Sequence, residues 1–212
     1  MAYAWPECAA YGAGDEEVTM PPSTYYAVLL ALVIGVGCGE KGKEKTTPKA
    51  QAKFRAEHNR FNHIIQQAAD LYQFPPAIIK AVIWRESRFN PDARGTSWEY
   101  GLMQIREAAA HEWALAAGVT GFRTEHLLNP KTNIRAGTWY LKKWSDRAPH
   151  ADNPLPFALA TYNAGPTKAR EWAKDTNSSA ELFIEQINYP ATRGYVQDIL
   201  KKQVEFRKMF EK

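Results

Sequence analysis

The chain has 212 residues, of which 45% are hydrophobic, 12% aromatic and 24% charged. This composition is typical of a globular protein and excludes both a disordered chain and a polytopic membrane protein, while the length allows one ordinary domain and a smaller segment. The formal charge of +4 is unevenly spread: all 27 Lys and Arg, but only 19 acids, follow Cys38, so that Cys38 to Lys212 carries +8. Such a charge favours an anionic partner: nucleic acid, a membrane surface or an acidic cell-wall polymer.

An uncharged apolar segment, Tyr25–Gly39, stands before a polar run that is rich in lysine. It is shorter than the ~20 residues that a transmembrane helix needs, and this length predicts the core of an export signal. Small residues followed by Cys38 resemble the lipobox of bacterial lipoproteins, in which the cysteine is lipidated and becomes the mature N-terminus. We therefore expect a signal segment over 1–38, a flexible tether over 39–50 and a folded domain over 51–212, with a retained short anchor as the alternative.

From about Gln51 onward, apolar residues recur at three- and four-residue spacing, which predicts an all-α domain of seven or eight short helices. No strand-like alternation stands out. The first helix is expected to bury an apolar face that runs from Phe54 to Leu71. The second is expected to begin at Pro75, because proline is tolerated in the first turn of a helix. The expected later helices are Pro75–Ser87, Glu107–Ala117, Pro130–Asp146, Pro154–Asn163, Thr167–Lys174, Ala180–Ile187 and Thr192–Phe210.

Glu86 is a charged residue on an apolar helix face. Ile83, Val82 and Ile79 lie three, four and seven positions before it, so its carboxyl shares their side of the helix. An apolar setting raises the pKa of a carboxyl, which a general acid working near neutral pH requires. The alternative is a glutamate at a helix end that pairs with a neighbouring arginine. The candidates are Arg85, Arg88 and Arg94.

Four sequence blocks follow one another in order: ESRFNPDAR from Glu86, GLMQI, ATYNAGP and TRGYVQDIL. Together they are similar to the lytic transglycosylases of the soluble-lytic-murein (SLT) type, relatives of goose-type lysozyme, over about Phe61 to Lys202. The resemblance implies a lysozyme-like helical fold and cleavage of the MurNAc–GlcNAc bond of peptidoglycan. It also implies that Glu86 protonates the leaving oxygen and then takes the proton of the muramoyl C6 hydroxyl, which attacks C1 to give a 1,6-anhydromuramoyl end.

The resemblance further implies residues that contact the substrate. Gly101 is expected to let the backbone approach the sugar closely, and Gln104 offers it an amide. Tyr162 is expected to hold Glu86 or a sugar through its hydroxyl, whereas core packing is nearly as good an interpretation of Tyr195. The expected substrate-binding set is Gly101, Met103, Gln104, Tyr162, Asn163 and Tyr195, with helix capping as the alternative for Asn163.

Three positions depart from the family pattern. Gly95 stands where a serine is usual, and Ala191 replaces a glutamate whose charge would help to keep Glu86 protonated. Arg106, where a methionine is common, is expected either to lower the pKa of Glu86 or to bind a carboxylate of the peptide stem.

Two further enzyme and binding functions remain alternatives to the transglycosylase. Most glycosidases use two carboxylates, and Asp92 and Glu99 are the nearest candidates for the second one, although their polar loop favours capping or solvation. A hydrolytic goose-type muramidase is therefore one alternative. A weakly catalytic wall-binding module of an envelope-spanning machine, with an unknown partner, is the other.

Several other ligands are not indicated by the sequence. No nucleic-acid recognition motif or phosphate-binding glycine loop is present, and the five histidines lack metal-binding spacing. We expect no cofactor and no metal, peptidoglycan as the partner, and a location in the bacterial cell envelope with a membrane anchor.

Overall fold

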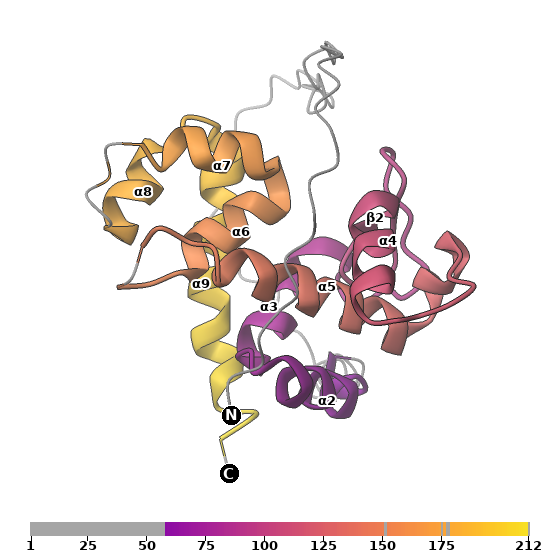
Figure 1. Ribbon diagram of the computed structural model, residues 1–212. Coiled ribbons are helices and arrows are strands. Elements are labelled where there is room, and N and C mark those ends of the chain that lie inside the picture. Colours follow the sequence, from indigo (N-terminus) through magenta and orange to yellow (C-terminus); the bar gives the residue numbers. More distant parts are fainter. Residues whose placement is uncertain (1–57, 151, 175, 177–178, 212) are drawn as a thin grey trace, which may run out of the picture. The chain divides into compact units, whose positions relative to one another are not determined.

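Helix α3 (Pro76–Ser87) is the central helix of the computed structural model, which describes residues 58–150, 152–174, 176 and 179–211 (Figure 1). Every residue of α3 from Ala77 to Ile83 is buried. Helices α9 (Pro190–Arg207) and α2 (Asn62–Tyr72) pack against it. The expected signal segment and tether, including Cys38, lie outside the described residues.

The prediction of an all-α domain is confirmed, and the described residues form eight α-helices. From α3 onward, each helix begins and ends within three residues of its expected bounds. The remaining helices are α4 (Glu107–Ala116), α5 (Pro130–Ser145), α6 (Leu155–Ala164), α7 (Pro166–Trp172) and α8 (Ala180–Gln186), with a 3-10 helix, η1 (Thr124–Leu128).

The first expected helix needs a correction. Arg60 and Phe61 form a turn, and α2 begins only after it, so no continuous helix carries the expected face. Phe54 lies outside the described residues. Leu71, expected to point inward, is 53% exposed and lines a surface hollow together with residues of α5.

A short antiparallel hairpin, β1 (Glu99–Tyr100) and β2 (Ile105–Arg106), was not predicted. Strands of two residues are too short to show the alternating pattern from which strands are recognised. The connecting loop contains two left-handed residues, Gly101 with φ of 70° and Gln104 with φ of 46°.

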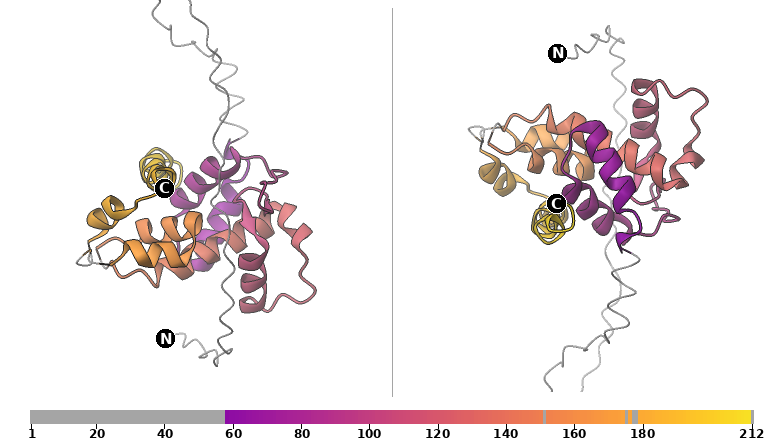
Figure 2. Two further views of the ribbon diagram at one scale, coloured as in Figure 1. Left: turned by 90° about the horizontal axis from the view of Figure 1, so that it is seen from above. Right: turned by 90° about the horizontal axis from the view of Figure 1, so that it is seen from below.

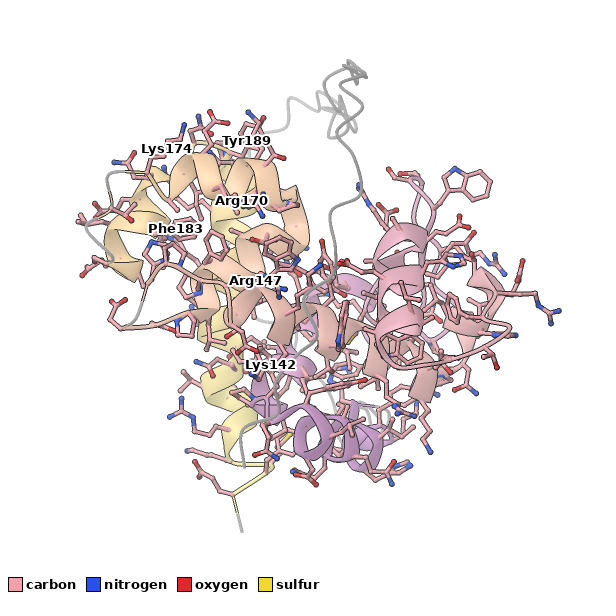
Figure 3. All side chains as sticks on the ribbon, in the orientation of Figure 1. Lys142, Arg147, Arg170, Lys174, Phe183 and Tyr189 are labelled. Atoms are coloured by element: carbon pink, nitrogen blue, oxygen red, sulfur yellow. The ribbon has the colours of Figure 1, made fainter. Side chains whose placement is uncertain are left out.

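Helix α5 joins two groups of elements. It contacts α2, α4, β2 and η1 along one part and α6 along another, while α6 packs on α7, α8 and α9 (Figures 1 and 2). Phe183 of α8 is fully buried beside the rings of Phe157 and His150, whereas Arg147, Arg170 and Lys174 are exposed (Figure 3). Among the described residues, no helix is both long and apolar enough to cross a membrane.

Lys80 is a fully buried cation in the middle of α3. Its Nζ donates hydrogen bonds to Oδ1 of Asn59 at 2.7 Å and to Oδ1 of Asn62 at 2.6 Å. Burial lowers the pKa of Lys80 from 10.5 to about 8. Three phenylalanine rings lie 5.2–5.8 Å from Nζ: Phe89, Phe206 and Phe210.

The buried Lys80 ammonium should make the stability of the protein depend on alkaline pH. Between about pH 8 and 10.5 the unfolded chain holds this proton while the folded chain releases it, so the free energy of unfolding rises with pH. The Lys80→Met variant lacks this rise. Between pH 7 and 10.5 its free energy of unfolding should therefore fall by about 3 kcal/mol relative to the wild type, as measured by urea denaturation.

The control is Lys201→Met at an exposed position of α9, which should follow the wild-type pH dependence. If the free energy of unfolding of Lys80→Met changed with pH in the same way as that of the wild type, the lowered pKa of Lys80 would be contradicted.

Candidate active site

Glu86 lies in the last turn of α3 and follows the buried part of that helix. Ile79, Val82 and Ile83, which share its face, are all completely buried. The chain then leaves the helix through two left-handed residues, Arg88 with φ of 52° and Phe89 with φ of 65°. The helix end therefore places the Glu86 carboxyl beside an apolar core, as the sequence predicted, while the residue as a whole keeps some exposed surface.

Tyr195 of α9 is the hydrogen-bond partner of Glu86. Its Oη donates to Oε1 of Glu86 at 2.6 Å, and the tyrosine is only 2% exposed. The bond spans the packed interface between α3 and α9, so the two helices fix the direction of the carboxyl. Tyr195 is therefore part of the core and also a contact of the candidate acid.

The surroundings raise the pKa of Glu86 from 4.5 to about 7, and burial is the largest cause. The hydrogen bond from Tyr195 and the charge of Arg85 act in the opposite direction, and so does Arg106. The charge of Glu99 raises the pKa further. Near neutral pH a large fraction of Glu86 is thus protonated, as a general acid requires.

The arginines that flank Glu86 in the sequence have other partners. Arg85 Nε lies 3.6 Å from the carboxylate of Asp198. The interpretation of Glu86 as an ion-pair partner is therefore not supported. The other two arginines stack on aromatic rings, Arg88 on Trp84 at 3.9 Å and Arg94 on Tyr100 at 5.4 Å.

One hydrogen bond from α3 and one from α6 hold the hairpin on one side. Ser87 Oγ donates to the carbonyl of Leu102 at 2.8 Å, and Tyr162 Oη donates to the carbonyl of Met103 at 2.7 Å. Tyr162 thus holds the hairpin, while Tyr195 takes the contact with Glu86 that the sequence suggested for Tyr162. Burial raises the pKa of both tyrosines well above 10, so both hydroxyls remain donors.

Asn133 of α5, which the sequence did not reveal, fixes the hairpin from the other side. Its Nδ2 donates to the carbonyls of Tyr100 at 2.7 Å and Leu127 at 2.9 Å, and its Oδ1 accepts from the N–H of Met103 at 2.8 Å. Asn133 is fully buried with all three bonds made. The only sign of this role in the sequence is that Asn133 is a polar residue on the inward face of an amphipathic helix.

Gly101 and Met103, which were expected to contact a sugar, are both buried inside the protein. A Cβ at Gly101 would lie 2.5 Å from both Asn133 Nδ2 and the Leu127 carbonyl, and its φ of 70° also favours glycine. Met103 is fully buried against Gly137, where a Cβ would lie 2.5 Å from its Sδ. Both residues therefore shape the hairpin from within.

Gln104 and Asn163 are the expected polar contacts that remain open to solvent in part. Gln104 is half-buried, and its Nε2 donates to the carbonyls of Gly101 at 2.8 Å and Ala93 at 3.1 Å. Asn163 is exposed near the end of α6, and its Oδ1 accepts from Thr192 Oγ1 at 2.7 Å. The hydrogen bonds of these two side chains thus involve Nε2 of Gln104 and Oδ1 of Asn163.

Glu99 is paired within the hairpin. Its Oε1 accepts from Arg106 Nε at 3.0 Å, and Arg106 Nη2 lies 2.9 Å from the same oxygen. Its Oε2 accepts from the N–H of Ser97 at 3.0 Å and would lie only 2.2 Å from a Cβ at Gly95. The missing side chain at Gly95 thus leaves room for the Glu99 carboxylate, and Arg106 pairs with Glu99.

Within the described part of the chain, no three His, Cys, Asp or Glu side chains gather as metal ligands. The helical fold, with a shielded carboxyl at the end of a buried helix, is consistent with a lysozyme-like domain. The chain belongs to the Transglycosylase SLT domain family, which matches residues 63–183.

Proteins similar in sequence include lytic transglycosylases of two kinds. The soluble lytic murein transglycosylase of Escherichia coli K12 is 30% identical over 150 residues, which are 69% of this chain and 23% of that protein. The membrane-bound lytic murein transglycosylase F of Desulfosudis oleivorans is 38% identical over 109 residues, 50% of this chain and 22% of that protein. The chain thus spans about a quarter of the length of these relatives.

Solved structures agree with this assignment. An inactive Glu-to-Gln mutant of the lytic transglycosylase Slt of Pseudomonas aeruginosa superimposes with a TM-score of 0.65 at 29% identity, over 72% of this chain and 24% of that one. The 70 kDa soluble lytic transglycosylase of Escherichia coli gives a TM-score of 0.61 at 27% identity, over 76% of this chain and 27% of that one.

Replacement of Tyr195 tests its contact with Glu86. The Tyr195 hydroxyl stabilises the ionised carboxylate, so Tyr195→Phe should raise the pKa of Glu86. A general acid loses activity as pH rises through its pKa. The alkaline limb of kcat/KM should therefore move to higher pH by about one unit, while kcat falls because the carboxyl loses its positioning partner.

Tyr162→Phe is the matched variant, because it removes a buried hydroxyl that does not contact Glu86. Its alkaline limb should stay in place. If the alkaline limb did not move in Tyr195→Phe, or moved equally in both variants, the hydrogen bond from Tyr195 would not be what sets the pKa of Glu86.

Proposed function

We propose that the protein is a peptidoglycan lytic transglycosylase in which Glu86 is the only acid and base. The observation that carries this proposal is the shielded Glu86 carboxyl, whose pKa of about 7 and hydrogen bond to Tyr195 suit a proton donor. Membership of the SLT family and the similarity to proteins named lytic murein transglycosylases support the choice of murein as substrate. A similar enzyme, the 70 kDa soluble lytic transglycosylase, has been solved in complex with bulgecin A.

The proposed reaction needs one carboxyl because the substrate supplies the nucleophile. Protonated Glu86 donates its proton to the oxygen that links C1 of N-acetylmuramic acid to N-acetylglucosamine, and the C1–O bond breaks. The muramoyl C6 hydroxyl then bonds to C1, and its proton passes to the Glu86 carboxylate. The product is a 1,6-anhydromuramoyl end, and Glu86 is again protonated.

Tyr195 serves both halves of this cycle. Its hydroxyl keeps the carboxyl oriented during proton donation and stabilises the negative charge that Glu86 carries before it takes the second proton. Gln104 through Oε1 and Asn163 through Nδ2 are proposed to contact the glycan, since their other polar ends are already bonded. Gly101 and Met103 support these residues from inside the fold.

Hydrolysis by a second carboxylate is less well supported by the site. Glu99 bonds to Arg106 and to the N–H of Ser97, so both of its oxygens already have partners. Asp92, the other candidate, is exposed in the loop after α3. Neither arrangement provides a base that is poised to activate water.

We also propose that the protein works in the bacterial cell envelope, held to a membrane through lipidated Cys38. Relatives named membrane-bound lytic murein transglycosylases and the apolar segment before Cys38 support this location. One acyl chain binds membranes only marginally, and the lysines that follow Cys38 would add attraction to anionic lipid.

The products released from purified sacculi test the proposal. The wild-type protein should release muropeptides with anhydro ends, which borohydride does not reduce, as read by mass spectrometry. Glu86→Gln should lower this release at least about 100-fold because the proton donor is lost. Glu181→Gln, which changes an exposed acid on α8, is the control and should retain wild-type activity.

Products with reducible ends would replace the proposal with a hydrolytic muramidase. Release that is absent from the folded wild type, or unchanged in Glu86→Gln, would overturn the enzymatic function and favour a wall-binding module.

A further inference from the structure

A surface hollow of about 230 Å³ lies between α2 and α5. Helix α2 is at the bottom of Figure 1 and faces the viewer in the right panel of Figure 2. None of the residues of the hollow belongs to the candidate active site. We call this site the α2–α5 hollow; its lining residues are Ile64, Gln67, Ala68 and Leu71 of α2 and Lys131 and Arg135 of α5.

The floor of the hollow is an apolar helix face with an incomplete cover. Ile64, Ala68 and Leu71 follow one another at spacings of four and three residues, so they lie on one side of α2. Ala68 is buried, but Leu71 is 53% exposed at the end of the row. An aliphatic side chain that enters the hollow would bury this surface, which is favourable in proportion to the apolar area removed from water.

Two cations of α5 border the apolar row. Lys131 and Arg135 are four residues apart and therefore point to the same side of the helix. Neither forms an ion pair with any acid of the described residues. A carboxylate is the acceptor that an arginine bonds most strongly, and it also pairs with a lysine ammonium.

We propose that the α2–α5 hollow is a docking site for another protein, which inserts an aliphatic side chain flanked by aspartate or glutamate. The aliphatic group would cover Leu71, and the neighbouring carboxylates would meet Lys131 and Arg135. The chain itself is a poor occupant by charge: residues 39–57 contain six Lys and Arg against three acids, and Cys38 to Lys212 carries +8. The charge of the hollow therefore selects an acidic partner other than a second copy.

Binding of short peptides to the full chain in detergent tests this proposal. The probes are three fluorescein-labelled peptides, SEDLELEDS, SEDSESEDS without the leucines and SKKLKLKKS without the acids, with fluorescence anisotropy as the readout. Only the first peptide should bind with a dissociation constant below about 1 mM. The Lys131→Gln/Arg135→Gln variant should weaken its binding about tenfold or more, and so should Leu71→Ser.

The control removes two exposed charges from α9, Lys201→Gln/Arg207→Gln, and should leave the dissociation constant unchanged. Release of muropeptides from sacculi shows that each variant is folded, because no changed residue lies in the active site. The proposal would be overturned if both double variants lost the same affinity for the first peptide. It would also be overturned if the peptide without leucines bound as tightly as the first one, or if no peptide bound at all. Competition by a soluble muropeptide would overturn it as well, since the hollow would then be a site for peptide stems.

Discussion

Removal of water from one carboxyl is the constraint on which the rest of this structure depends. Glu86 is placed at the end of a helix whose inward residues are completely buried, and burial outweighs every other influence on its pKa. The same packing of α3 on α9 that excludes water also brings the Tyr195 hydroxyl to the carboxyl. The stability of the fold and the pKa of Glu86 thus depend on the same interface, so a change in the packing of α3 on α9 would alter both.

The hairpin is held beside this interface by polar contacts from three helices. Ser87 of α3, Asn133 of α5 and Tyr162 of α6 each bond to its backbone, and the two side chains inside it, Leu102 and Met103, are fully buried. A loop of two-residue strands has little stability by itself, and these bonds supply a fixed geometry. Its outer edge then carries Glu99, whose charge contributes to the raised pKa of Glu86. Since burial is the main cause of that pKa, the pKa of Glu86 is raised even though Ala191 stands in place of an acid.

Helical spacing and the Glu86 position could be predicted because both follow from the order of apolar residues along one helix. The partner of the carboxyl could not, since Tyr195 and Tyr162 occupy similar places in apolar segments and only tertiary packing decides which hydroxyl reaches Glu86. Gly101 and Met103 were expected at a sugar because a short motif does not show which of its side chains point inward. Asn133 was missed for a related reason: its partners are backbone groups of a hairpin that has no sequence pattern of its own.

The most direct test of this account is the pKa of Glu86 itself. Glutamate labelled with carbon-13 at its side-chain carboxyl can be followed by NMR as the full chain is titrated, and the resonance that disappears in Glu86→Gln identifies the residue. The account predicts a midpoint near pH 7. A midpoint near 4.5, the ordinary value for glutamate, would contradict the claim that burial makes this residue an acid at neutral pH.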